Sequence, residues 1–440
     1  MDTKLVRTKW IDTNKGDQAH PDYRSRLVAM EFNDGQDPSL FAATPPLEAM
    51  RFLVHLAATK RKGENHCLMT IDVKRAYFNA QATSDVFISI PKEDQQPGDE
   101  HRVGKLRRCL YGTRDADFNW GETVAAQLRS CGYIRGVAIP SVYHNPEDVV
   151  ACMVHGDDYL CVGPNDALDK LKMNISKAFE IKHTRIGHRE GMEKEGRFLN
   201  RIIRATPSGW EVEADQRHGE LIAKELGVDM TKGLTTPGVD EPVDEADMEL
   251  HDWRLEKYRS LAARANYLAL DRPDLQFAVK ELCRNMSRPT ESSWRRLVRV
   301  GKYFVRSPRL IMQYDWQADT EELTVHSDAN WAGCVHSRKS TSGGVIMLGP
   351  IPLKHGQQPK PLLHYPPERL NITALSKANH VQLESETCLL ICLFPAILGS
   401  RLMQVPRKEL RTREVPERLG TFRSANYGCR TKSNAERWRL

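Results

Sequence analysis

The stretch that decides the fold is residues 149–163, VVACMVHGDDYLCVG. Two apolar runs flank a short polar segment, a pattern that predicts two strands joined by a tight hairpin turn. Two adjacent aspartates, Asp157 and Asp158, lie at that turn. An isolated pair is usually a solvated turn, because aspartate favours turns through local hydrogen bonds. The alternative is a cation site, since Mg²⁺ is held by one or two carboxylates plus substrate phosphates.

A second aspartate-bearing strand favours the cation site. Residues 67–79, CLMTIDVKRAYFN, predict an apolar strand ending at Asp72, with Tyr77 and Phe78 following five and six residues later. A strand-end aspartate and an Asp-Asp hairpin about 85 residues apart are typical of two-metal nucleotidyl transferases. In such enzymes two metals clamp the attacking and leaving oxygens at phosphorus. We expect Asp72 and Asp157 to bridge the metals and Asp158 to complete the cluster.

Composition indicates a globular protein rather than a membrane or disulfide-rich one. The chain has 440 residues, of which 40% are apolar and 28% charged, enough for two or three domains. It contains no run of about 18 apolar residues and no secretory signal at its start, so no membrane span or secretion is expected. Ten cysteines without a Cys-x-x-Cys pair favour a reducing compartment, cytoplasmic or nuclear.

The net charge of +6 is concentrated at the C-terminus. Residues 401–440 hold eleven Lys and Arg against four Asp and Glu, so the remainder of the chain is close to neutral. Nucleic-acid affinity in the body would therefore come from local basic patches rather than from a global field. We expect the basic tail to be disordered.

Hydrophobic periodicity predicts alternating helices and strands, which is an α+β or α/β pattern. The expected helices are residues 47–60, 119–132, 166–179 and most of 255–305, and the expected strands are 197–204, 323–328 and 342–349. Periodicity is poor after residue 398, and no internal repeat is present.

Several further segments carry motifs in a fixed order. They are YRSRLVA at 23–29, IDVKRAY at 71–77, LYGTRDA at 110–116, HGDD at 155–158, FEIK at 179–182, FLNR at 198–201, RPDLQFAV at 272–279 and SDANWAGC at 327–334. Together these motifs resemble the reverse transcriptase and ribonuclease H region of a copia-type retrotransposon Pol polyprotein, over roughly residues 22–350.

The resemblance implies an α+β fold: a right-hand polymerase with fingers, palm and thumb, followed by a connection and a partial ribonuclease H-like α/β domain. The expected domains are 1–240 for the polymerase, 241–320 for a helical connection, 321–400 for the partial ribonuclease H-like domain and 401–440 for the tail. The implied activity is RNA-directed DNA synthesis with two Mg²⁺ ions, or Mn²⁺ in their place. The implied partners are an RNA or DNA template with its primer, deoxynucleoside triphosphates and other Pol-derived proteins.

The resemblance also implies roles for residues around the three aspartates. Tyr77 would lie beneath the incoming sugar and exclude a 2′-hydroxyl; the alternative is a core aromatic, and the spacing from Asp72 favours the first. Arg24 and Arg26 would grip the triphosphate, since guanidinium groups match phosphate geometry, or form a solvated basic strand. Lys182 would donate a proton to pyrophosphate, or be a surface lysine. In the same way, Tyr111 and Gly112 would line the nucleotide and template site.

The sequence departs from the family pattern in three respects. His155-Gly156 replaces an aromatic and an apolar residue, and we expect Gly156 to loosen the turn. Asp328 matches the first ribonuclease H carboxylate and Glu386 loosely matches the second, but no aspartate follows Asp328, so that activity is expected to be lost. Protease, zinc-knuckle and integrase motifs are missing from the sequence.

Two alternatives to an active polymerase remain open. The chain could be a catalytically inactive transposon remnant that keeps at most a nucleic-acid-binding surface, as the missing carboxylates and basic tail indicate. It could also be a metal-free binding module, whose phosphate contacts would give steep salt dependence without catalysis.

Overall fold

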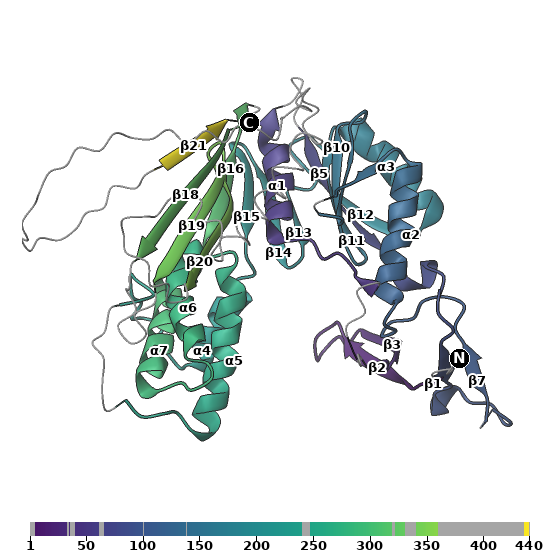
Figure 1. Ribbon diagram of the computed structural model, residues 1–440, viewed down its shortest axis with the longest axis horizontal. Helices are drawn as coiled ribbons and strands as arrows, with labels where there is room; N and C mark the ends of the chain where they lie inside the picture. Colours follow the sequence, from purple (N-terminus) through teal and green to yellow (C-terminus); the bar gives the residue numbers. More distant parts are fainter. Residues whose placement is uncertain are drawn as a thin grey trace, which may run out of the picture. The chain divides into compact units, whose positions relative to one another are not determined.

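The computed structural model describes residues 5–32, 35, 40–60, 66–99, 101–137, 139–239, 247–318, 322–330, 340–359 and 435–439. The chain divides into two compact units. The first comprises Met1–Val212 with Gln313–Asp319, and the second comprises Glu213–Met312 with Thr320–Leu440. Figure 1 labels their helices and strands. Within the ranges just given, no helix is both long enough and apolar enough to cross a bilayer.

A six-stranded antiparallel sheet forms the centre of the first unit, in the order β12-β5-β11-β10-β9-β8. Its strands are β5 (Cys67–Val73), β8 (Ile134–Arg135), β9 (Val142–Asn145), β10 (Val150–His155), β11 (Asp158–Gly163) and β12 (Ile181–Ile186). The predicted strand at 67–73 and the predicted hairpin at 149–163 are both confirmed. β10 and β11 are buried along most of their length, because helices cover both faces of the sheet.

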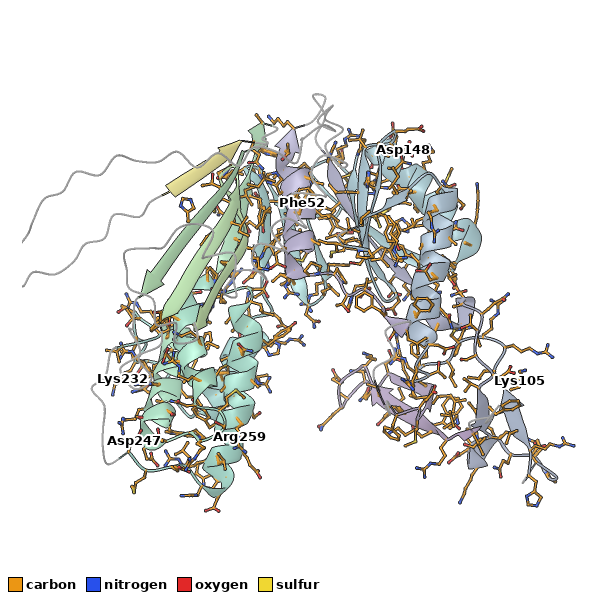
Figure 2. The ribbon with its side chains drawn as sticks, viewed as in Figure 1. Phe52, Lys105, Asp148, Lys232, Asp247 and Arg259 are labelled. Atoms are coloured by element: carbon orange, nitrogen blue, oxygen red, sulfur yellow. The ribbon has the colours of Figure 1, made fainter. Side chains whose placement is uncertain are left out.

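Two helices, α2 (Ala116–Ser130) and α3 (Asn165–Ala178), pack on one face, where Met69, Ile71 and Trp120 join one apolar core. A third helix, α1 (Leu47–Ala58), packs against β10 and β11 from the other side (Figure 1). Figure 2 shows the side chains that crowd around Phe52 of α1, which is 1% exposed. All three helices were predicted, with ends that differ by at most three residues.

The hairpin between β10 and β11 turns through two residues, Gly156 and Asp157, since His155 pairs directly with Asp158. Gly156 has φ +59°, whereas Asp157 has a negative φ, the sign pattern of a type II′ turn. Glycine is the residue that this first turn position favours. The expectation that Gly156 loosens the turn is therefore wrong: an L-residue there would be strained.

The prediction of a single strand at residues 197–204 is wrong. Residues 197–204 form parts of two strands, β13 (Glu195–Phe198) and β14 (Arg201–Thr206), joined at Leu199 and Asn200. Both linking residues have positive φ, 47° and 63°, so the chain reverses there. Apolar residues lie on both sides of the turn, Phe198 and Leu199 before Asn200 and Ile202 and Ile203 after it, which is why the sequence pattern suggested one strand.

The remaining strands of the first unit form small sheets. They are β1 (Leu5–Val6), β2 (Thr8–Asn14), β3 (Tyr23–Ala29), β4 (Thr59–Lys60), β6 (Phe87–Ser89), β7 (Val103–Lys105), β15 (Gly209–Glu213), β16 (Ile311–Asp315) and β17 (Gln317–Ala318). Of these, β2 and β3 form an antiparallel hairpin, and β15 and β16 extend the β13-β14 sheet.

The second unit contains a helical core and a four-stranded antiparallel sheet. Its helices are α4 (Arg217–Glu225), α5 (Asp252–Ala269), α6 (Gln276–Arg284) and α7 (Glu291–Arg306), and its sheet has the order β20-β19-β18-β21. The strands are β18 (Glu322–Asn330), β19 (Thr341–Leu348), β20 (Ile351–Pro359) and β21 (Ala435–Arg439). Of the tail expected to be disordered, 435–439 alone lie in the described residues, and they form β21, in which Trp438 pairs with Leu323.

Candidate active site

Strand pairing brings two of the predicted carboxylates side by side. β5 and β11 are neighbours in the six-stranded sheet, and their register sets Asp158 directly opposite Asp72. Directly opposite residues of antiparallel strands project from the same face, with Cβ atoms about 4.5–5.5 Å apart. That face is the one covered further along by α1, because Ile71 and Tyr159 point to the α2 and α3 side.

Asp157 lies at the tip of the hairpin and is exposed. Its carbonyl oxygen accepts a hydrogen bond from the backbone N–H of Val73 at 2.9 Å, which ties the tip to the end of β5. On the other side, the indole Nε1 of Trp120 donates to the carbonyl oxygen of Gly156 at 2.7 Å. A backbone hydrogen bond from β5 and a side-chain hydrogen bond from α2 therefore hold the tip that carries the aspartates.

The three aspartates repel one another. Burial, followed by the charges of Asp157 and Asp72, raises the pKa of Asp158 to about 6. A divalent cation would offset this repulsion, and a pair of carboxylates suits Mg²⁺ when substrate phosphates complete its shell. In the ranges that the structure describes, however, no three His, Cys, Asp or Glu side chains are grouped closely enough to hold a metal by themselves.

Lys182 extends the row of charges across the sheet. β12 is the other neighbour of β5, and its register sets Lys182 opposite Asp72. The cross-strand row on this face is thus Asp158, Asp72 and Lys182, two acids beside one exposed base.

An aromatic cluster lies next to the acidic pair. The chain leaves β5 through Arg75, which has φ 55°, and enters a short 3₁₀ turn, η2 (Ala76–Asn79). The ring of Tyr77 there meets the ring of Tyr111 edge-on, with centroids 4.8 Å apart. Burial, then the hydrogen bond that Tyr77 donates to Asp117, then the charge of Asp157 raise the pKa of Tyr77.

Gly112 lets the β2–β3 hairpin approach this cluster. The residue has φ +85°, and a Cβ atom on it would lie 2.1 Å from the carbonyl oxygen of Ala29, at the end of β3. The backbone N–H of Ala29 donates to the carbonyl of Tyr111 at 2.7 Å. Glycine is therefore required here by close backbone contact as well as by φ.

Arg24 and Arg26 are exposed and share one face of β3, two residues apart. Burial and the charge of Asp157 raise the pKa of Tyr111, while Arg26 lowers it, so this ring lies in the field of both groups. Asp72, Asp157, Tyr77, Tyr111 and Arg26 thus share one neighbourhood, and Arg24 lies further along the strand.

Sequence reasoning missed two neighbours of this site. Asp117 accepts a hydrogen bond from the Tyr77 hydroxyl, and Trp120 donates one to the carbonyl oxygen of Gly156 in the hairpin turn. Both residues lie on α2, just after the LYGTRDA motif. A cavity of about 230 Å³ adjoins the site, with Tyr77, Asp117, Trp120 and Gly156 in its wall. The i, i+3 spacing of Asp117 and Trp120 at the start of a helix was the available signal.

The structure describes the backbone of one of the two ribonuclease H candidates, Asp328. Asp328 lies in β18, where its backbone pairs opposite Gly343 of β19. Glu386 lies outside the described residues.

Residues 1–189 match the family described as reverse transcriptase (RNA-dependent DNA polymerase). The chain is 26% identical over 365 residues to the retrovirus-related Pol polyprotein from transposon RE2 of Arabidopsis thaliana, covering 79% of this chain and 24% of the relative. It is 23% identical over 354 residues to the Pol polyprotein from transposon TNT 1-94 of Nicotiana tabacum, covering 77% and 26%. These matches confirm the resemblance to a copia-type Pol polyprotein predicted from the motifs.

The chain spans about a quarter of the length of these curated relatives. Among solved structures, the apo telomerase of Candida tropicalis, truncated from its C-terminal domain, is similar over 46% of this chain and 53% of that one. Its sequence identity is 12% and its TM-score 0.25, which is too low to support an argument about the fold.

Proposed function

We propose that the chain is the RNA-directed DNA polymerase of a copia-type retrotransposon, extending a primer with deoxynucleotides on an RNA or DNA template. The observation that carries this proposal is the strand register that sets Asp158 opposite Asp72 inside the region matching the reverse transcriptase family. We propose the cytoplasm or nucleus as its location.

In this proposal the six-stranded sheet with α2 and α3 is the palm, and the β2–β3 hairpin belongs to the fingers. Residues 1–240 make up the polymerase with its thumb, 241–320 the connection and 321–400 a partial ribonuclease H-like domain. The close contact of Gly112 with Ala29 supports a fingers strand that reaches the palm beside the acidic pair.

Asp72, Asp157 and Asp158 would hold two Mg²⁺ ions, or Mn²⁺, which stabilise the charge on the attacking and leaving oxygens in an in-line displacement at phosphorus. The raised pKa of Asp158 supports this role, because it reflects repulsion that a bound cation would remove. The chain's own contribution is positioning: the Val73 and Trp120 hydrogen bonds hold the hairpin tip in one place.

The incoming nucleotide would lie between β3 and the aromatic cluster. Arg24 and Arg26 would bind its triphosphate, Tyr111 and Gly112 would line the base and template site, and Tyr77 would contact the sugar. The hydrogen bond to Asp117 supports that role for Tyr77, because it fixes the ring by its hydroxyl. Lys182 would donate a proton to pyrophosphate, and its position opposite Asp72 in the sheet supports this role.

Ribonuclease H activity is proposed to be lost. That chemistry needs several carboxylates around two metals, and the sequence contains no aspartate after Asp328. Glu386 is the one further candidate that the motif comparison offers.

Primer extension on poly(rA)/oligo(dT) with Mg²⁺ tests the proposal. The wild-type chain should incorporate dTTP, and Asp157→Asn should reduce incorporation to background. Asp166→Asn, which removes an exposed carboxylate in the first turn of α3, is the matched control and should leave incorporation unchanged. Equal background incorporation by all three proteins would refute a polymerase.

The second candidate is an inactive remnant that binds nucleic acid. The observation that favours it is that no three metal-binding side chains are grouped in the described part of the chain. In that case the protein would bind primer-template with steep salt dependence, and none of the aspartate substitutions would change incorporation.

A further inference from the structure

A pair of buried thiols lies beneath the hairpin that carries the aspartates. Cys152 of β10 and Cys161 of β11 are directly opposite each other, and both are completely buried. Their Sγ atoms are 3.2 Å apart, and both cysteines are free. We propose that these two cysteines are an oxidative modification site, at which a peroxide forms an intrachain disulfide; this inference does not depend on the polymerase proposal.

The register of the hairpin makes the pair suitable for a disulfide. In a two-residue hairpin, the residues that flank the turn, His155 and Asp158, form a hydrogen-bonded pair, and pair types then alternate along the ladder. Cys152 and Cys161 are three pairs from the turn, which makes them a non-hydrogen-bonded pair with Cα atoms about 4.5 Å apart. Disulfides span Cα separations of roughly 4.4–6.8 Å.

The closed hairpin therefore already has the backbone geometry that the disulfide requires. The Sγ atoms must approach from 3.2 Å to about 2.05 Å, which small rotations about the two Cα–Cβ bonds provide. Two other buried cysteines, Cys67 and Cys109, differ from this pair, because their Sγ atoms contact oxygen and nitrogen atoms rather than a second thiol.

A third buried group lies within electrostatic range of the pair. The hydroxyl of Tyr133 is buried without a hydrogen-bond partner, and the pKa of this tyrosine is raised by burial first and then by Cys161 and Cys152. A buried unpaired hydroxyl is costly, so its presence calls for an explanation. The oxygen of the sulfenic acid that precedes the disulfide can accept this hydrogen bond while that intermediate lasts, whereas the thiols accept it only weakly.

The chemistry balances with hydrogen peroxide as the oxidant. One thiol attacks the peroxide, the O–O bond breaks, and a sulfenic acid and one water form. The second thiol then attacks the sulfenic sulfur, the S–O bond breaks, and a second water leaves as the S–S bond forms. Two electrons pass from the two sulfurs to the peroxide, and reduction by dithiothreitol reverses the change.

Burial of the two thiols slows this reaction but does not change its product, the disulfide. Desolvation raises the pKa of the Cys152 thiol well above its usual value, so the nucleophilic thiolate is scarce in the closed hairpin. Oxidation must therefore pass through local opening of the sheet, and the first sulfenic acid then meets its partner on reclosing.

Peptide mapping tests the proposal on the intact chain. Trypsin releases residues 136–170 as one peptide, which carries both Cys152 and Cys161 and no other cysteine. After treatment with hydrogen peroxide, denaturation and alkylation, this peptide should be two hydrogens lighter than its reduced form and unalkylated. The peptides 63–74 and 109–114, which carry Cys67 and Cys109 alone, should be alkylated in the same sample.

Two further arms make the result decisive. Dithiothreitol before alkylation should restore two alkylation sites to peptide 136–170, and oxidation of the unfolded chain in guanidinium should give mixed pairings. In Cys161→Ser, peroxide should leave Cys152 as a sulfenic acid that dimedone traps. The proposal is overturned if peptide 136–170 of the native wild-type chain is alkylated at both cysteines, or if fragmentation places added oxygen on a cysteine sulfur instead of an S–S bond. Oxygen on Met153, which peroxide also oxidises, is located in the same spectra and does not count. Neither reading needs the variant to fold.

Discussion

Two aspartates on inner strands of their sheets differ in the residues that the described strand pairings set opposite them. Asp72 of β5 pairs with Asp158 of β11 on one side and Lys182 of β12 on the other. Asp328 of β18 pairs with Gly343 of β19, which has no side chain to share a cation. The comparison shows that a strand-borne aspartate becomes part of an acidic site through what the neighbouring strand sets opposite it, and not through its own motif.

The largest expected effect tests the two aspartates against each other. Asp72→Asn should lower primer extension by about 10²–10³-fold, because it removes charge stabilisation where the reaction develops charge. Asp328→Asn should leave it unchanged, since its strand neighbour offers no carboxylate. Steady-state incorporation of dTTP by the two variants measures the difference between the two aspartates. Equal losses of incorporation would contradict a role for Asp72 that Asp328 does not share.

The hairpin turn that presents Asp157 and Asp158 gives the next largest effect. Gly156→Ala should lower the free energy of unfolding by about 1–2 kcal/mol, because alanine at φ +59° is strained. Gly121→Ala is the matched control: it lies inside α2 with open space around its Cβ position and should instead stabilise by about 0.5–1 kcal/mol. Urea unfolding of both variants measures the difference, and the same sign for both would contradict the turn assignment.

The pH dependence of stability tests the repulsion at the acidic pair. The pKa of Asp158 is raised to about 6, so between about pH 4 and pH 6 the folded chain binds more protons than the unfolded chain. Asp158 therefore lowers stability progressively as pH rises through that window, and the loss is complete above it. Asp158→Asn should be more stable than wild type at about pH 7.5 and no more stable at about pH 3.5.

Urea unfolding at the two pH values measures this difference. A stability gain for Asp158→Asn that is equally large at both values would show that repulsion is not its cause. Asp166→Asn, in the exposed first turn of α3, controls for the removal of a carboxylate elsewhere on the same unit.

The smallest expected effect comes from introducing a second carboxylate opposite Asp328, in the four-stranded sheet of the second unit. Gly343→Asp sets a carboxylate opposite Asp328 and should lower stability at neutral pH by about 0.2–1 kcal/mol relative to its value in acid. Gly344→Asp pairs with Ser327 instead and should show no such pH-dependent part. Thermal unfolding of both variants at two pH values measures the pH-dependent part of the stability change. The same pH dependence in both variants would show that the strand register does not determine the charge repulsion.

Much of the candidate site was readable from the sequence because its motifs coincide with strand ends. The apolar runs in 67–73 and 149–163 predicted the strands that carry Asp72 and the Asp-Asp turn. Their register was not readable, because it is set by how the hairpin docks on β5 across a long stretch of intervening chain.

Other features needed coordinates for physical reasons. The role of Gly156 depends on its φ, which composition does not reveal, and the reversal at Leu199 and Asn200 has apolar residues on both sides. Asp117 and Trp120 act through single hydrogen bonds to Tyr77 and Gly156, and such pairings leave little trace in periodicity.

The order of the strands bears on how the protein is synthesised. β5 leaves the ribosome before its two neighbours in the sheet, β11 and β12, which end at Gly163 and Ile186. Until those strands emerge, β5 has neither edge paired, and its apolar residues are open to mispairing or to chaperones. Such sequence-distant pairings slow folding, so the nascent chain must keep this strand protected for more than a hundred residues of translation.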